Sequence, residues 1–256
     1  IFPTRSRTSN RDYAGELWRC YIFNCSPSWN FRSGNRLPSK PGSSGYSISC
    51  WRKVIMILFP SNYKQFPNAS EGENEIYSLL RNSKLASNWI VLHSLEIAHH
   101  LKKNQSEADF VFMIPNVGIL VLEVKSCKSL SFDGTTWQLG NKQETRGPFK
   151  QASDNMFSIR EYLESVNIDI KAIPFVSAVW FTHISRKKVQ DSISWMPEQF
   201  LSAEDLKQEI TQVIAGTTKT LISNLKRNFG AQVAPFHQLE LVSQALRPRF
   251  VAHQAP

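Results

Sequence analysis

The sequence contains few cysteines, and their positions narrow the class of protein. Only 4 of the 256 residues are cysteine, and Cys20, Cys25 and Cys50 lie within the first 50 residues. All 6 histidines lie beyond that segment, so the sequence does not favour a local four-ligand zinc site. Since nothing resembles a disulfide framework, we expect a reduced Cys127 and a reducing compartment.

Long hydrophobic runs are also missing. The apolar stretch near the start, VIMILF at 54–59, is too short to span a bilayer, and no small-residue cleavage site follows it. We therefore expect a cytoplasmic protein with no membrane partner. The chain also lacks a glycine-rich phosphate loop ending in Gly-Lys-Ser or Gly-Lys-Thr, so this sequence is not itself an ATPase motor.

The formal net charge of +9 is distributed unevenly. Residues 1–55 contain nine Lys or Arg and two acidic residues, a net +7, which leaves 9 − 7 = +2 for residues 56–256. Basicity is therefore no evidence for DNA binding by the rest of the chain. We expect 1–55 to be a disordered or non-native leader and the native protein to begin at Met56. A native disordered arm whose arginines contact nucleic acid is the alternative.

Beyond residue 69 the pattern predicts alternating helices and strands. Ser70 is a candidate N-cap, and the acids and apolar stripe after it predict a helix of about three turns. Strands are expected at 89–97, 108–114, 118–126 and 173–181, with a hairpin at 129–139 and helices at 149–163, 202–214, 217–228 and 236–246. This αβββαβ order predicts an α/β fold, a mixed sheet flanked by helices. We expect 56–215 to form one domain and 216–256 a helical extension.

The strand at 118–126 ends in an unusual pair of charges. Its sequence, GILVLEVKS, is apolar on both faces until Glu123 and Lys125 appear on one face. Burying such charges is costly unless they are paired or bound to a metal. Asp109 and Glu123, with the carbonyl of Val124, form a half-shell suited to Mg²⁺ or Mn²⁺. Lys125 could orient or deprotonate an attacking water, so these residue types predict metal-dependent cleavage of a phosphodiester.

The turn between the two strands must have a particular length for this site to form. In an antiparallel pair, Asp109 can face Glu123 only if an odd number of residues separates the strands. A two-residue turn at 116–117 would pair Pro115 with Gly118 and aim Asp109 at the wrong face. We therefore predict a longer, odd-length turn or a β-bulge.

Several runs of this sequence resemble a known family: EGENEIYSLL, EADFVFMIPNVGILVLEVKS, Trp137 and PFKQA. They are similar to the nuclease-related domain, NERD, of the PD-(D/E)XK nuclease superfamily, and the resemblance covers about residues 56–183. It implies a restriction-endonuclease-like core with Asp109, Glu123 and Lys125 at catalytic positions. It further implies a supporting helix glutamate at Glu73 and a helix glutamine at Gln151. Ala108 stands where the superfamily name implies a proline.

The resemblance implies a nuclease that acts on DNA in processing or repair. Because the family often precedes a helicase motor, a helicase in cis or in trans is an expected partner. A catalytically inactive nucleic-acid-binding module of a helicase is the alternative function.

Individual residues also have simpler explanations. Glu123 and Lys125 could form a salt-bridged strand end, Glu75 could replace Glu73, and Gln151 could be solvated. Lys142, Arg146 and Lys150 are expected around the mouth of the site, where they would hold a nucleic-acid backbone or form a solvated basic face.

Overall fold

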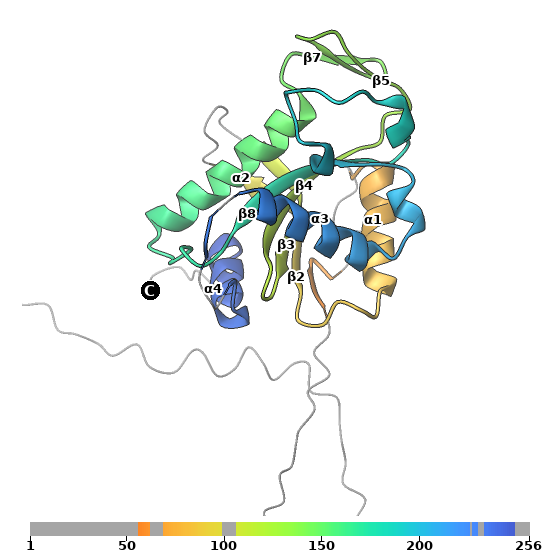
Figure 1. Ribbon diagram of the computed structural model, residues 1–256. Helices are drawn as coiled ribbons and strands as arrows, with labels where there is room; N and C mark the ends of the chain where they lie inside the picture. The colour runs from red at the N-terminus through yellow and green to blue at the C-terminus, as the bar shows by residue number, and fades with distance from the viewer. Residues whose placement is uncertain (1–55, 62–68, 99–105, 226, 230–232, 249–256) are drawn as a thin grey trace, which may run out of the picture. The chain divides into compact units, whose positions relative to one another are not determined.

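The computed structural model describes residues 56–61, 69–98, 106–225, 227–229 and 233–248, all within one compact unit, Trp51–Pro256. The predicted leader lies outside these residues. A six-stranded mixed sheet has the order β1-β2-β3-β4-β8-β9 (Figure 1). Its strands are β1 (Ile57–Phe59), β2 (Ile90–Ile97), β3 (Ser106–Ile114), β4 (Gly118–Lys125), β8 (Phe175–Phe181) and β9 (Phe200–Leu201). The helices are α1 (Glu71–Asn82), α2 (Pro148–Ser165), α3 (Ile210–Asn224) and α4 (Phe236–Leu246).

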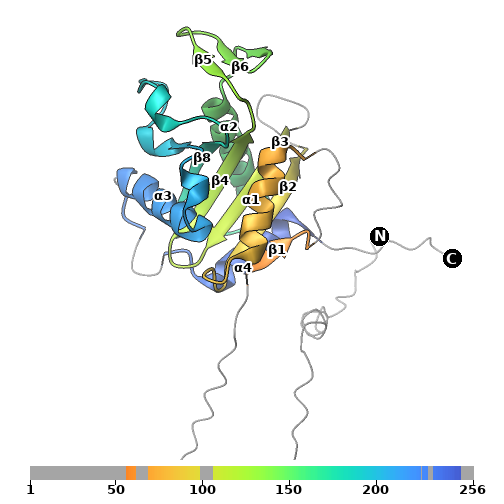
Figure 2. The same cartoon turned by 90° about the vertical axis from the view of Figure 1, so that its right-hand side faces the viewer.

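Helices cover both faces of the sheet, as predicted. Apolar residues of α1 and α3 pack on one face in one hydrophobic cluster, and those of α2 and α4 pack on the other face in a second cluster (Figure 2). β4 lies between these clusters: Leu120 and Leu122 contribute to the first, and Ile119 and Val121 to the second. Burial on both faces explains the continuous apolar run of this strand. Within the described residues, no helix combines the length and the apolar character that a membrane crossing needs.

A second, three-stranded sheet stands beyond the end of β4. It contains β5 (Leu130–Phe132), β6 (Trp137–Leu139) and β7 (Lys142–Glu144) (Figure 1). β5 and β6 confirm the predicted hairpin, and β7 adds a strand that the sequence pattern did not show. Aromatic side chains of this sheet pack against the start of α2 and against β8 in a third hydrophobic cluster, which includes Trp137, Phe149 and Phe181.

Two predicted helices are wrong in their extent: in place of separate helices at 202–214 and 217–228, a single helix, α3, runs from Ile210 to Asn224. The segment 202–208 is not α-helical: it carries only a single 3₁₀ turn at Asp205–Lys207, and α3 begins at Ile210. Asp205 Oδ2 accepts both the N–H and the hydroxyl of Ser202, each at 2.7 Å, and such local bonds compete with helix formation. Glu209 then caps α3 by accepting the Gln212 N–H at 2.8 Å. The domain division near residue 216 stays a prediction, although α3 runs across that point.

The turn between β3 and β4 confirms the predicted parity. Ile114 pairs with Gly118, so the turn contains three residues, and Phe110 pairs with Leu122 at the far end of the ladder. Asn116 adopts a positive φ of 61°, which asparagine tolerates in such hairpin turns. Continued by one residue, this register places Asp109 opposite Glu123.

Gly118 makes that register possible, and its replacement tests the turn. Its φ is +154°, and a Cβ there would lie 2.7 Å from the Pro174 carbonyl oxygen. We expect Gly118→Ala to lower the free energy of unfolding by about 1–3 kcal/mol, because backbone atoms must move. Urea denaturation of the purified protein measures the change.

Gly216 provides the matched control. It lies inside α3 with no atom within 4 Å of an added Cβ, so Gly216→Ala should leave stability unchanged or raise it by up to about 1 kcal/mol. Equal effects of the two substitutions would contradict the role assigned to Gly118.

Candidate active site

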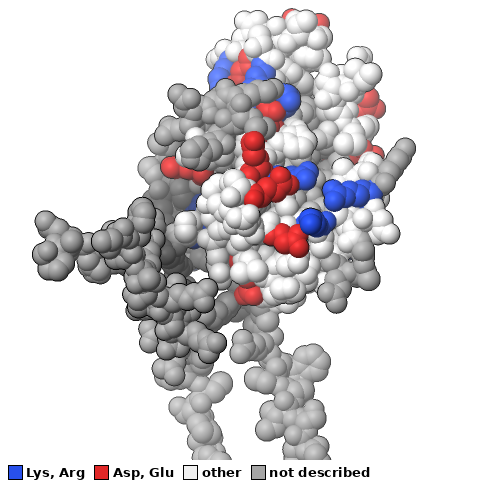
Figure 3. Space-filling model, turned by 90° about the vertical axis from the view of Figure 1, so that its left-hand side faces the viewer, with Lys and Arg blue, Asp and Glu red and all other residues white. Residues whose placement is uncertain are grey.

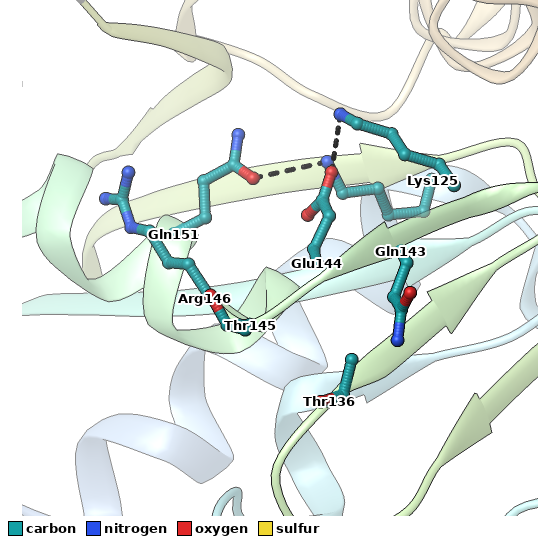
Figure 4. Close-up of a pocket in the computed structure, with 8 residues that line it drawn as sticks. Lys125, Thr136, Gln143, Glu144, Thr145, Arg146 and Gln151 are labelled. Atoms are coloured by element: carbon teal, nitrogen blue, oxygen red, sulfur yellow. Dashed lines mark hydrogen bonds and ion pairs between the residues drawn. The ribbon is translucent and has the colours of Figure 1, made fainter.

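Glu123 and Lys125 form the centre of the site at the end of β4. Glu123 is 2% exposed, and its Oε1 accepts the Lys125 ammonium at 2.6 Å. Among the described residues, its Oε2 has no hydrogen-bond partner although it is buried. Lys125 also donates to Gln151 Oε1 of α2 at 3.4 Å (Figure 4). The salt-bridged strand end is therefore present, but it leaves one buried carboxylate oxygen unsatisfied.

Asp109 reaches the same region through a break in the sheet. β2 and β3 pair on both sides of this point, His93 with Phe110 and Leu95 with Ala108, but the ladder omits Ser94 and Asp109. Ser94 has a positive φ of 51°, and side-chain alternation shifts there. Asp109 Oδ2 consequently accepts the backbone N–H of Val124 at 2.6 Å. The carboxylate is thus bound to β4 directly beside Glu123.

Glu73 joins the site from α1 and has two roles. Its Oε1 accepts the Ser70 N–H at 3.0 Å in a capping box, so it stabilises the helix start. Its Oε2 lies 3.4 Å from Nε2 of His93, a fully buried ring stacked on Phe110. The side chain of Glu73 is only 12% exposed, whereas Glu75 is exposed. The structure therefore favours Glu73 over its rival.

The N-terminus of α1 is held against the end of β4 by close packing. The Gly72 N–H donates to Ser126 Oγ at 2.8 Å, one residue after Lys125. A Cβ on Gly72 would lie 2.6 Å from that hydroxyl and 2.7 Å from a Thr182 methyl group. Only glycine fits without a shift of these neighbours, and this contact fixes the position of Glu73.

The acidic side chains of the site repel one another. Burial, followed by the charges of Glu123 and Glu73, raises the pKa of Asp109 well above its usual value, against the effects of the Val124 N–H and Lys125. Burial also raises the pKa of Glu123, although Lys125 opposes the change. For Glu73, hydrogen bonds from His93 and Ser70 outweigh burial and lower the pKa. Among the described residues, the carboxylates of Asp109, Glu123 and Glu73 thus lie near the single ammonium group of Lys125, so the site has more acidic than basic groups.

Lys125 is held in its charged form. Burial alone would lower the pKa of its ammonium group, but the carboxylates of Glu123 and Asp109 outweigh burial and raise it. Of the two roles predicted for Lys125, orienting the attacking water agrees with a protonated amine, whereas deprotonating the water does not. A protonated amine can also stabilise negative charge.

A pocket of about 690 Å³ opens beside Lys125 (Figure 4). Its lining comes from the end of β4, the small sheet, the loop before α2 and α2 itself: Lys125, Thr136, Lys142, Gln143, Glu144, Thr145, Arg146 and Gln151. Gln151 thus faces the site instead of open solvent. Glu144, which the sequence reasoning missed, lies close enough for its charge to raise the pKa of both Glu123 and Lys125.

The predicted basic residues contact acidic partners. Lys142 pairs with Glu144 at 2.5 Å, and Arg146 and Lys150 both contact Asp154, at 3.1 and 2.9 Å. On the face shown in Figure 3, Lys and Arg are interspersed with Asp and Glu. Lys142 and Arg146 do line the pocket, so their predicted position is confirmed, but the visible surface of that face is not uniformly basic.

Arg247, which follows α4, is a supporting residue that sequence reasoning also missed. Its guanidinium donates to the His93 carbonyl and, at 3.1 Å, to the Ser94 carbonyl. It therefore holds the distorted point of β2 that lies opposite Asp109. No local sequence signal could reveal this contact, because 153 residues separate Arg247 from Ser94.

The donor set suits a hard divalent cation. Within the described residues, no three or more His, Cys, Asp or Glu side chains form a metal cluster. Two carboxylates are nevertheless enough for Mg²⁺, which keeps several waters. In an extended strand the N–H and C=O of one residue point toward the same neighbour, so the Val124 carbonyl faces the gap that Asp109 occupies. The unsatisfied Oε2 of Glu123 is the observation that fits an ion best.

These features define the class of protein. A mixed sheet with helices on both faces, and an Asp, Glu and Lys gathered at the end of its central hairpin, form a restriction-endonuclease-like core. Residues 68–182 match the family model of the nuclease-related domain, NERD. This match confirms the predicted resemblance to the family over that segment of the chain. No curated protein and no solved structure was found to match the chain.

The raised pKa of Asp109 predicts a pH-dependent cost to stability. The pKa of Asp109 is higher in the folded than in the unfolded chain, so folding favours the protonated carboxyl. The stability that this protonated form contributes is lost as pH rises through the folded-state pKa. Asp109→Asn keeps an acceptor for the Val124 N–H without the charge. Near pH 7, without divalent cations, it should raise the free energy of unfolding by about 0.5–2 kcal/mol. Below about pH 4 the difference should vanish.

Urea denaturation across this pH range measures the effect. Asp169→Asn is the control, because Asp169 is exposed and its carboxylate also accepts one backbone N–H, that of Lys171 at 3.0 Å. If Asp109→Asn were less stable than the wild type at neutral pH, the repulsion inferred here would be absent.

Proposed function

We propose that the nuclease-related domain is a divalent-metal-dependent nuclease that acts on DNA. The observation that carries the proposal is the buried Glu123 Oε2 beside the carboxylate of Asp109, an oxygen that has no hydrogen-bond partner among the described residues. Two converging carboxylates with raised pKa values favour binding of a cation in addition to the Lys125 ammonium group.

Asp109, Glu123 and the Val124 carbonyl would hold Mg²⁺ or Mn²⁺. When bound, such an ion supplies charge neutralisation at the scissile phosphate and acidifies a water ligand. Binding would also relieve the repulsion between the two carboxylates, so it should be coupled to proton release from Asp109.

The remaining residues would position the reacting groups. Lys125, held as an ammonium by Glu123, would orient the attacking water and stabilise the negative charge that develops on the phosphate. Gln151 fixes the direction of the Lys125 side chain from α2. Glu73, anchored by Ser70 and His93, adds negative charge near Asp109 and Glu123 that would favour the cation. The pocket beside Lys125 would admit the phosphodiester backbone.

A role in DNA processing or repair and a helicase partner extend this proposal from the family resemblance. The alternative is a nucleic-acid-binding module without catalysis. Calorimetry separates the two: DNA binding without binding of Mg²⁺ or Mn²⁺ by the wild type would favour the module.

Cleavage assays on Lys125→Ala test the catalytic assignment. With Mg²⁺ or Mn²⁺, we expect the wild type to cleave DNA and the variant to be slower by about 10²–10⁴-fold, because it lacks the group that orients the water. Lys171→Ala is the control: Lys171 is exposed and precedes β8, at the end of the sheet away from the site. Urea denaturation shows whether the variant is folded.

Two results would contradict the proposal. One is the absence of cleavage of both single-stranded and duplex DNA with either ion. The other is a rate for Lys125→Ala equal to that of the Lys171→Ala control. Cleavage of an RNA oligonucleotide in preference to its DNA counterpart would overturn the assignment of DNA as substrate.

A further inference from the structure

A second, smaller cavity adjoins the pocket beside Lys125. Its volume is about 190 Å³. Its walls come from the small sheet, the loop before α2, the start of α2 and the loop after β8: Phe132, Thr135, Trp137, Thr145, Gly147, Phe149, Lys150 and Ser194. Thr145 lines both this cavity and the larger pocket, so the two spaces are neighbours.

The walls of this cavity are aromatic. The ring of Phe132 stacks on Trp137 with centroids 4.5 Å apart and planes 24° apart, and Phe149 lies 5.8 Å from the same indole. A Cβ on Gly147 would lie 2.3 Å from Trp137 Nε1, so the glycine lets the backbone approach the ring. The hydroxyl-bearing residues Thr135, Thr145 and Ser194 also line the cavity. Aromatic walls with hydroxyl groups beside them suit a flat, partly polar ring.

Positive charge lies beside the cavity. Arg146 and Lys150 both contact the buried carboxylate of Asp154, at 3.1 and 2.9 Å, so two cationic side chains lie together at this place. α2 begins there without a side-chain cap and without an acidic residue in its first turn. The helix start and the two cations together favour a phosphate at this position.

We propose that the cavity binds one unpaired nucleobase of a DNA strand whose backbone occupies the adjoining pocket. A cavity of roughly 150 Å³ accepts a benzene ring, so this volume has room for a single base and none for a base pair. A base inside a duplex cannot reach such a site without leaving the stack. The cavity therefore selects single-stranded or locally unpaired DNA. The assignment of the strand as DNA rests on the proposed function.

Binding of two oligonucleotides without divalent cations tests this site. The probes are fluorescently labelled octathymidylate and an abasic octamer with the same phosphates, each titrated in EDTA with the full chain. We expect the wild type to bind octathymidylate about tenfold more tightly, since stacking on an aromatic side chain contributes on this order. Phe132→Ala should bring the ratio of the two affinities close to one and leave the affinity for the abasic octamer unchanged.

Phe157→Ala is the matched control. Phe157 lies on α2, is 46% exposed and does not line the cavity, so its variant should keep the wild-type ratio. Ser194→Leu is a second variant in which the cavity is filled instead of opened. Because Ser194 is exposed, this change should not disturb folding, and it should also reduce the ratio.

The outcomes separate this proposal from the catalytic one. Equal affinity of the wild type for the two oligonucleotides would overturn the base site, whatever the nuclease activity. So would wild-type ratios in both Phe132→Ala and Ser194→Leu. Discrimination between the oligonucleotides without any cleavage in Mg²⁺ or Mn²⁺ would instead support the base site and refute the proposed nuclease.

Discussion

A side-chain oxygen of Asp109 accepts the Val124 N–H at 2.6 Å, at the point where the backbone ladder between β3 and β4 ends. In a regular ladder, a main-chain carbonyl of β3 would occupy this position. With the carboxylate there instead, Asp109 lies beside Glu123, and the Val124 carbonyl faces the same gap. The remaining contacts of the site arrange charge around this gap: Lys125 and Gln151 from one side, Glu73 and His93 from the other.

This arrangement costs stability in the protein without a bound ion. Glu123 is buried and Asp109 partly buried, and nearby carboxylates raise the free energy of ionising both: Glu123 and Glu73 act on Asp109, and Glu73 and Glu144 act on Glu123. A structure optimised for stability alone would replace such a group with apolar residues. Destabilising charge clusters of this kind are typical of functional sites, and the proposed divalent cation would relieve the repulsion in this one.

The sequence predicted those features that depend on local patterns. The strands flanking the turn and the N-cap at Ser70 follow from hydrophobic patterning and backbone chemistry, and the structure agrees. The odd length of the turn follows from the requirement that Asp109 face Glu123, and the structure agrees here too. The short strands β1, β7 and β9 were missed, since two or three residues carry too little periodicity to distinguish a strand from a loop. The delayed start of α3 was missed because the Asp205 carboxylate satisfies Ser202 locally.

The distortion at Ser94 could not be predicted for a different reason. It depends on tertiary contacts: alternation changes at Ser94 opposite Asp109, and Arg247 donates hydrogen bonds to the carbonyls of His93 and Ser94. Burial lowers the pKa of the Arg247 guanidinium, and the charges of Glu96 and Glu107 oppose the change. Keeping this cation partly buried therefore costs desolvation free energy.

Arg247 lies outside the segment that matches the family model, residues 68–182. The family segment supplies every side chain proposed to act on the phosphodiester, yet the backbone that orients Asp109 is held by a residue that follows α4. Since α4 also packs on the α2 face of the sheet through Leu239 and Val242, its position and that of Arg247 are set by the same apolar surface. The geometry of the site therefore depends on the packing of α4 as well as on the nuclease-related segment. A resemblance restricted to that segment therefore includes the proposed reacting groups but not Arg247, which holds the backbone opposite Asp109.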